Sequence, residues 1–245
     1  MSRDEPQAPA PPAEHPLAGV GARGALRWVR APLQARSQAT LDRILDAAEA
    51  LVAEKGFDDT PVSEVASRAG SSVGAFYNRF QDKAGLLYAL YARFLDQATA
   101  TADDALDPSR WEGARIPDIL DAVVPFLVSV FRERRGLMRA FSLRNHTDPE
   151  FRARQERLSH HVSSRLGVLL MARRGEIGHE DPERAAAFGL SMVFSTIEDA
   201  VLFGDMRSGF LVLSDSDLAA ELTRAYLAYL GVARAPAPKP GPPAG

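Results

Sequence analysis

The sequence predicts an all-α protein, and three observations support this prediction. Between about Leu26 and Val232, apolar residues recur every three or four positions, which is the spacing of one face of an α-helix. The alternating Val, Ile and Thr patterns of β-strands are rare. Ten of the 17 prolines lie in the first 16 and the last 10 residues, in segments rich in Ala and Pro. We expect these segments, residues 1–25 and 232–245, to be disordered tails around a helical core.

The composition excludes several classes of protein. The chain has 245 residues, 46% of them hydrophobic and 25% charged, as in ordinary soluble domains. It has no cysteine, which excludes disulfide scaffolds, thiolate metal sites and cysteine nucleophiles. No continuous apolar stretch approaches the roughly 20 residues of a membrane span, and no signal peptide is recognisable. We therefore expect a cytoplasmic protein without a membrane partner.

The first helices are predicted from their apolar stripes and their end signals. Leu41 begins a stripe that continues to Val52, and Gly56 ends this helix as a C-cap. Thr60 followed by Pro61 opens a second, short helix, which Gly70 stops. Ser71 or Ser72 caps a third helix, and Asp82 caps a fourth. Three short helices with a tight glycine turn between the last two form a helix-turn-helix candidate.

The spacing inside this candidate has a mechanical interpretation. Ala66 is small where two helices cross, Gly70 suits a left-handed turn, and Phe76 anchors the following helix to the core. The remaining positions of that helix are small or polar, which would allow it to enter the major groove of DNA. Tyr77, Arg79 and Lys83 would supply hydrogen bonds to phosphates. The alternative is a helical hairpin with a solvated face.

Residues 39–87, "ATLDRILDAAEALVAEKGFDDTPVSEVASRAGSSVGAFYNRFQDKAGLL", resemble the N-terminal DNA-binding domain of the TetR family of transcriptional regulators. The resemblance includes Gly56-Phe57, Ala66-x-x-x-Gly70 and the run from Ser72 to Lys83. It implies that the third helix reads the groove and that Tyr77 and Lys83 hold phosphates. The sequence departs from the family pattern at Ser71, Val73 and Gly85, which leaves the operator sequence open.

The predicted DNA contacts include one residue of a basic lead-in. Between Pro16 and Leu41 there is no acidic residue but four arginines, at positions 23, 27, 30 and 36. This segment would follow the DNA backbone or enter a minor groove, as some N-terminal arms do, or it is a solvated arm. The full set of predicted DNA-binding residues is Arg36, Thr60, Ser71, Ser72, Val73, Ala75, Tyr77, Asn78, Arg79 and Lys83.

The rest of the chain predicts further helices. Their expected ranges are Lys83–Asp104, a helix opened by Pro117 and kinked at Pro125, Leu137–Arg144, Pro149–Arg173, Pro182–Met206 and Asp215–Leu230. Residues 26–84 would form the DNA-binding domain, and residues 85–231 a helical domain for ligand binding and dimerisation.

The last two helices are apolar on more than one side, which indicates a second packing partner. The resemblance implies that they pair with their copies in a homodimer; burial within one subunit is the alternative. The predicted interface residues are Phe188, Met192, Ile197, Val201, Leu218, Leu222, Tyr226 and Tyr229.

A ligand pocket is expected near the kink that Pro125 should impose on its helix. Its predicted lining is Phe94, Phe126, Val130, Met138, Phe141, His161 and Phe194, although a filled core would have the same composition. Residues 130–174 carry a net charge of +7. That charge indicates a solvated face, contacts between helices, or an acidic ligand.

No pattern of a catalytic or metal site is found. Gly19–Gly24 matches a dinucleotide fingerprint and Gly70–Gly74 a nucleophile elbow, but neither follows a predicted strand. The histidines lack ligand spacing, so no metal or cofactor is expected. The sequence thus predicts a homodimeric DNA-binding regulator, a repressor released from its operator by an unidentified small molecule, and not an enzyme. The alternatives are an all-α bundle enzyme and a structural dimer without DNA binding.

Overall fold

The structure is a computed structural model that describes residues 35–204 and 213–233, with side chains from Gln38 onward. Its regular elements are all helical, so the predicted all-α fold is confirmed. The arginines at positions 23, 27 and 30, residues 1–25 and most of the C-terminal tail lie outside the described residues, as does the side chain of Arg36.

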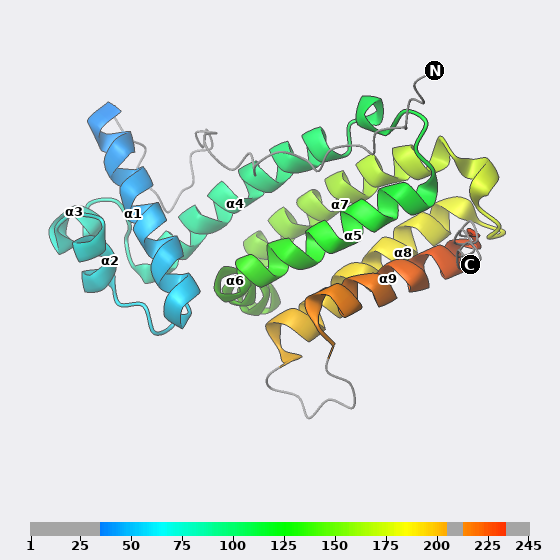
Figure 1. The fold of residues 1–245 in the computed structure, drawn as a ribbon. Coiled ribbons are helices and arrows are strands. Elements are labelled where there is room, and N and C mark those ends of the chain that lie inside the picture. The colour runs from blue at the N-terminus through cyan, green and yellow to red at the C-terminus, as the bar shows by residue number, and fades with distance from the viewer. Residues whose placement is uncertain (1–34, 205–212, 234–245) are drawn as a thin grey trace, which may run out of the picture.

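Three helices form a small head at one end of the molecule (Figure 1). They are α1 (Ala35–Lys55), α2 (Val62–Arg68) and α3 (Val73–Tyr77). The long helix α4 (Lys83–Ala105) begins in the head and extends along the helical bundle. Gly56 ends α1 with φ +84°, and the Asp82 carboxylate caps α4 by accepting from the Gly85 amide at 2.8 Å, as predicted.

The bundle contains the remaining helices, and all of them except the short α6, which is seen nearly end-on, run side by side in Figure 1. They are α5 (Ile116–Glu133), α6 (Arg135–Thr147), α7 (Pro149–Met171), α8 (Pro182–Ile197) and α9 (Asp215–Leu230). Short helical turns lie at Pro108–Trp111 (η1) and Arg174–Glu176 (η2). The sequence predicts most of these helices to within a few residues, because prolines mark the starts of α5, α7 and α8 and Gly231, at φ +69°, ends α9. The exception is α8, which was predicted to reach Met206 but ends at Ile197.

Helix α8 ends in a π-helical turn, η3 (Glu198–Leu202), that contacts α6. The Arg135 Nε donates to the Val201 carbonyl at 2.8 Å, and the Ser142 hydroxyl donates to Glu198. The Arg139 guanidinium lies 5.7 Å from the centre of the Phe203 ring. These contacts fix α6 against the end of α8, and α6 also packs on α1 of the head.

Candidate nucleic-acid interface

The turn between α2 and α3 is set by Gly70, which has φ +59°. The Ser71 amide donates to the Ala66 carbonyl at 2.9 Å, and the Gly70 amide donates to Ser67 at 3.0 Å. This pair of bonds is a Schellman motif, which requires a residue in the left-handed region after the helix. Ala66 itself is buried between the helices. The structure therefore builds the predicted helix-turn-helix from local backbone bonds.

Helix α3 is fixed by one cap and two aromatic anchors. The Ser72 hydroxyl accepts from the Ala75 amide at 3.0 Å, so Ser72 is the N-cap. Phe76 and Phe80 are fully buried, with ring centres 4.8 Å apart. Because the buried rings hold one side of α3 against the core, its other side must face the solvent.

The exposed side of α3 carries most of the predicted DNA contacts. Tyr77 is 51% exposed and Val73 42%, and Ser72 and Asn78 are also exposed. Ser71, Ala75 and Arg79 are half-buried at the margins of this face. It is a narrow surface of small and polar groups that a major groove can accept. The structure thus brings these seven predicted residues together.

Lys83 lies next to this face, but its ammonium group already has contacts in the DNA-free protein. Nζ donates to the Asp58 carbonyl at 2.9 Å and lies 4.7 Å from the centre of the Phe57 ring. An ammonium group has three donors, so it can also bind a phosphate. The contact ties the start of α4 to the loop after α1.

The prediction for Thr60 is wrong for its side chain. Thr60 is buried, with 1% exposure, and its hydroxyl donates to the Gly56 carbonyl at 2.7 Å. It neither reaches DNA nor caps α2, whose N-cap is Pro61. The hydroxyl instead stabilises the loop between α1 and α2.

The head carries little positive charge of its own. Residues 35–84 contain six Lys and Arg against eight Asp and Glu. Two of the cations are ion-paired on its surface, Lys55 with Glu64 and Arg68 with Glu54. Most non-specific affinity for DNA comes from cations that neutralise phosphates. The six cations include Arg36, and the lead-in adds three more arginines, so the lead-in holds a substantial part of the positive charge at this end of the chain.

The predicted pocket residues do not line one cavity. Phe141 and Met138 are buried, and Phe141 lies 4.8 Å from Tyr91 and 5.7 Å from Phe94, ring centre to ring centre, in an aromatic core. Phe194 instead approaches Phe131, at 6.3 Å. Phe126 and Val130 are half-buried on α5. This set therefore belongs to separate regions of packing, and helical spacing alone could not distinguish these regions from a pocket.

His161 also has a role different from the predicted one. Its Nε2 lies 2.9 Å from Asp103 Oδ1, so it faces α4. Arg165 hydrogen-bonds the same carboxylate, and this bond lowers the pKa of Asp103 more than burial raises it. The three residues connect α7 to α4.

The interface prediction needs a correction as well. Ile197, Val201, Leu218, Leu222 and Tyr226 are all at most 5% exposed within a single protomer. They pack in the core of their own protomer, as the alternative of burial within one subunit expected, and leave little surface for a second copy. Phe188 is 55% exposed, Met192 and Tyr229 are half-buried, and the rings of Phe188 and Tyr229 are 5.3 Å apart.

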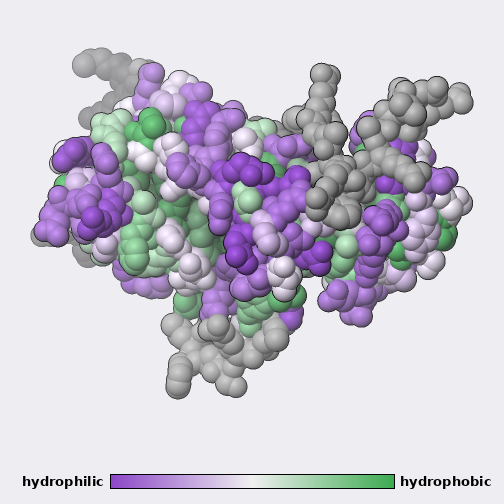
Figure 2. All heavy atoms as spheres, turned by 180° about the vertical axis from the view of Figure 1, so that it is seen from behind, coloured by the Kyte–Doolittle hydropathy of each residue, from purple (hydrophilic) through white to green (hydrophobic). Residues whose placement is uncertain are grey.

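The apolar character of α8 extends beyond this core. Among the described helices, Pro182–Leu202 is long and apolar enough to cross a membrane by length and composition, a test that core helices also pass. Less than half of its most apolar stretch, 44%, is buried in the protomer. Figure 2 shows hydrophobic residues between hydrophilic ones on the back of the molecule. The side of α8 that its own protomer leaves uncovered carries the exposed Phe188 and the half-buried Met192, next to exposed Ser191 and Ser195.

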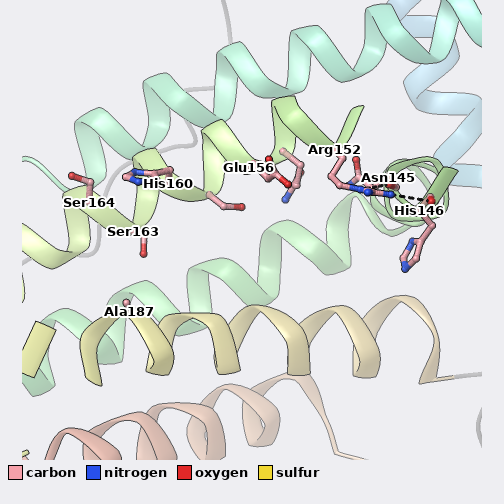
Figure 3. A pocket seen from close by; sticks show the side chains of 10 residues that line it. Asn145, His146, Arg152, Glu156, His160, Ser163, Ser164 and Ala187 are labelled. Atoms are coloured by element: carbon pink, nitrogen blue, oxygen red, sulfur yellow. Dashed lines mark hydrogen bonds between the residues drawn. The ribbon is translucent and has the colours of Figure 1, made fainter. Parts of the chain in front are cut away.

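One groove in the described structure was not predicted. It has a volume of about 940 Å³ and lies between α7 and α8 at the end of α6 (Figure 3). We call it the α7–α8 groove; it is lined by Asn145, His146, Arg152, Gln155, Glu156, Ser159, His160, Ser163, Ser164 and Ala187. The signal in the sequence is a polar stripe on α7 at helical spacing, which the prediction treated as a solvated face.

Comparisons with known proteins agree with this geometry. Residues 44–90 match the family model described as bacterial regulatory proteins, tetR family, and residues 116–230 match the one described as tetracyclin repressor-like, C-terminal domain. The HTH-type transcriptional regulator TtgR of Pseudomonas putida is 30% identical over 181 residues, which cover 69% of this chain and 83% of that protein. The chain belongs to the TetR family of transcriptional regulators. The predicted family is confirmed, and the protein is a helix-turn-helix DNA-binding regulator.

Solved structures of other transcriptional regulators show the same fold. A regulator from Mesorhizobium loti superposes with a TM-score of 0.63 at 21% identity, covering 81% of this chain and 98% of that one. The regulator FadR from Bacillus subtilis, in complex with stearoyl-CoA, gives 0.54 at 24% identity, with 77% and 96% covered.

Proposed function

We propose that this TetR-family protein is a homodimeric, cytoplasmic repressor that binds operator DNA through α3 and releases it when a small molecule binds the helical bundle. The observation that carries the proposal is the exposed face of α3, with Tyr77 and Val73 outward and Phe76 and Phe80 fully buried behind it. A helix held so firmly from one side, with small and polar groups on the other, is suited to a major groove.

Dimerisation is supported by the uncovered side of α8. Phe188 and Tyr229 form an aromatic pair on the surface, and Met192 lies one turn of α8 after Phe188. A second copy packed on this side would bury the apolar surface that the protomer leaves open. Two heads related by a two-fold axis would then bind a palindromic operator with half-sites spaced by whole turns of DNA.

The arginine lead-in would add charge to this interface. Because residues 35–84 have a net charge of −2, the head alone offers few cations to phosphates. We infer that the arginines at positions 23, 27, 30 and 36 contact the DNA backbone or a minor groove.

Release by a ligand requires that the ligand prefers the conformation that cannot bind DNA. Helix α6 connects the two regions, because it packs on α1 of the head and on η3 at the end of α8. FadR of Bacillus subtilis, a structural neighbour, was crystallised with stearoyl-CoA. For this chain we propose a small-molecule effector and no catalytic step.

DNA selection followed by a salt titration tests the function. The full chain is used to select sequences from a random DNA pool, and the affinity for the selected DNA is measured over a range of salt concentrations. The proposal expects a palindromic sequence and an affinity that falls steeply with salt. A chain that begins at Ala35 should bind the same sequence with a shallower salt dependence, since it lacks three arginines of the lead-in. Absence of binding at low salt would contradict the proposed function.

A further inference from the structure

One hydrogen-bond acceptor beside the α7–α8 groove is buried without a partner. Asn145 Oδ1 is buried and accepts no hydrogen bond from the described part of the chain. The amide of Asn145 hydrogen-bonds the Tyr91 hydroxyl, which in turn donates to Gln155 Oε1 at 3.0 Å. This network fixes the orientation of the amide, so Oδ1 stays an acceptor.

His146 adds a second acceptor. Its Nδ1 lies 2.8 Å from the Ser142 carbonyl, and a carbonyl can only accept, so Nδ1 carries the proton. In the neutral ring Nε2 therefore has a free lone pair. His146 lines the groove next to Asn145, at the C-terminal end of α6 (Figure 3).

The charges in the groove also favour a ligand that donates hydrogen bonds. The Glu156 carboxylate is exposed in the groove and has no hydrogen bond or ion pair within the described residues. The one arginine of the lining, Arg152, donates through Nε to the Asn145 carbonyl at 3.2 Å and through Nη2 to the His146 carbonyl at 3.1 Å. These carbonyls are the negative end of the α6 dipole, which offsets part of the guanidinium charge.

The arginines that give residues 130–174 their positive charge do not make this groove basic. Arg154 pairs with Glu150, Arg165 with Asp103 and Arg132 with Asp215. An acidic ligand, which the net charge of this segment suggests, would therefore find a single arginine in the groove, Arg152, and the Asn145 and His146 carbonyls already take two of its five N–H donors.

We propose that the α7–α8 groove binds a small organic amine in its ammonium form, with its N–H groups donating to Glu156 and to His146 Nε2. The volume of about 940 Å³ is within the range of small-molecule sites. Ser159 and Ser163, one turn apart on α7, add hydroxyls that can bind polar groups of the same ligand. The assignment of this groove as the effector site rests on the proposed function, whereas the binding of an amine does not.

Two probes of the same shape and opposite charge test the chemistry. Calorimetric titration of the full chain with tyramine should give saturable binding at millimolar concentration, and hydroxyphenylpropionate, its carboxylate counterpart, should bind much more weakly. Tighter binding of the carboxylate, or no binding of tyramine, would overturn the proposal.

Three variants locate the site. Glu156→Gln should weaken tyramine binding by on the order of fivefold, the size expected for a partly exposed charge pair. Glu112→Gln, another exposed carboxylate that lies outside the groove, should change nothing. Ala187→Trp fills the groove from α8 and should abolish binding. If Glu156→Gln and Ala187→Trp both bind tyramine as tightly as the wild type does, the assignment of the groove as the binding site is wrong.

Two further results separate this inference from the proposed function. Each variant is also titrated with the selected operator DNA, where we expect unchanged affinity without tyramine. Operator binding that persists in a protein that does not bind tyramine refutes the groove proposal and leaves the repressor intact. A second copy of the chain could also fill the groove. If the wild-type protein is a dimer that does not bind tyramine and the Ala187→Trp variant is a monomer, the groove is a contact between copies and the proposal is overturned.

Discussion

Gly136 of α6 lies directly against the backbone carbonyl of Val52 in α1. An ideal β-carbon on Gly136 would be 2.4 Å from the Val52 oxygen, well inside contact distance. The two helices belong to different parts of the molecule, since α1 is in the head and α6 is in the bundle. The distance between α1 and α6 is therefore set by the absence of a side chain at Gly136.

Gly136→Ala should force α1 and α6 apart. We expect a loss of about 1–3 kcal/mol in the free energy of unfolding, as for an overpacked core. We also expect a lower operator affinity at temperatures where the variant is folded, because the head is displaced.

Gly167→Ala in α7 is the matched control, since a β-carbon at that position would have no neighbour within 4 Å. It should gain about 0.5–1 kcal/mol of stability. Urea unfolding and DNA binding check both, and equal effects of the two substitutions would contradict the prediction.

Lys83 and Asn78 should affect DNA binding in different ways. Lys83→Met keeps the aliphatic stem next to Phe57 but removes the charge, so affinity should fall for every sequence and the salt slope should decrease by about 1. Asn78→Ala and Val73→Ala should change base preference, by about 1–3 kcal/mol for a good base contact. Equal losses on operator and random DNA for Asn78→Ala would show that Asn78 does not read bases. A changed base preference for Lys83→Met would contradict its role at phosphates.

Substitutions of Phe188 and Ile197 should affect dimerisation and folding stability separately. Phe188→Glu adds a charge to a side chain that is 55% exposed in the protomer, so the dimer should dissociate while each protomer stays folded. Ile197→Ala truncates a fully buried residue and should cost about 2–5 kcal/mol of stability. Sedimentation velocity and thermal unfolding measure the two effects. A dimer that survives Phe188→Glu would place the interface elsewhere.

Asp148 should make stability fall in acid. Burial raises the pKa of Asp148, but hydrogen bonds from Tyr88 and from the Phe151 and Glu150 amides, with the Arg144 charge, together lower it below its usual value. A carboxyl group with a lowered pKa in the folded protein stabilises it above the unfolded pKa, and this stabilisation is lost as the pH falls through the folded pKa.

A double-mutant cycle of Tyr88→Phe and Asp148→Asn checks this sign. Asparagine can still cap α7, so the cycle isolates the charged hydrogen bond. We expect a coupling of about 1 kcal/mol at neutral pH that decreases below about pH 4. A coupling that grows on acidification would refute the assignment.

The sequence predicts the features that depend on neighbouring residues. Gly70, Ser72, Asp82 and Gly231 all have the predicted turn or cap role, because each acts on backbone groups at most five residues away. The helix-turn-helix follows from such local bonds, and so does the exposed face of α3.

Features that depend on which side of a helix meets which neighbour could not be predicted in this way. Tyr226 and Phe188 are both apolar residues on amphipathic helices, yet one is fully buried and the other is 55% exposed. Thr60 looks like a cap in sequence, but its hydroxyl bonds backward to Gly56. The α7–α8 groove depends on the distance between helices that are far apart in the chain, and a helical period contains no such distance.

The Ser72 cap has a consequence for how the head approaches DNA. Its oxygen already accepts from the Ala75 amide, and a hydroxyl group has a single proton, which this bond does not use. Ser72 is therefore directed to act outward as a donor, toward a phosphate oxygen or the N7 or O6 of a purine, and less readily toward the amino group of adenine or cytosine. The same bond that starts α3 thus restricts which base edges an operator can place opposite this residue.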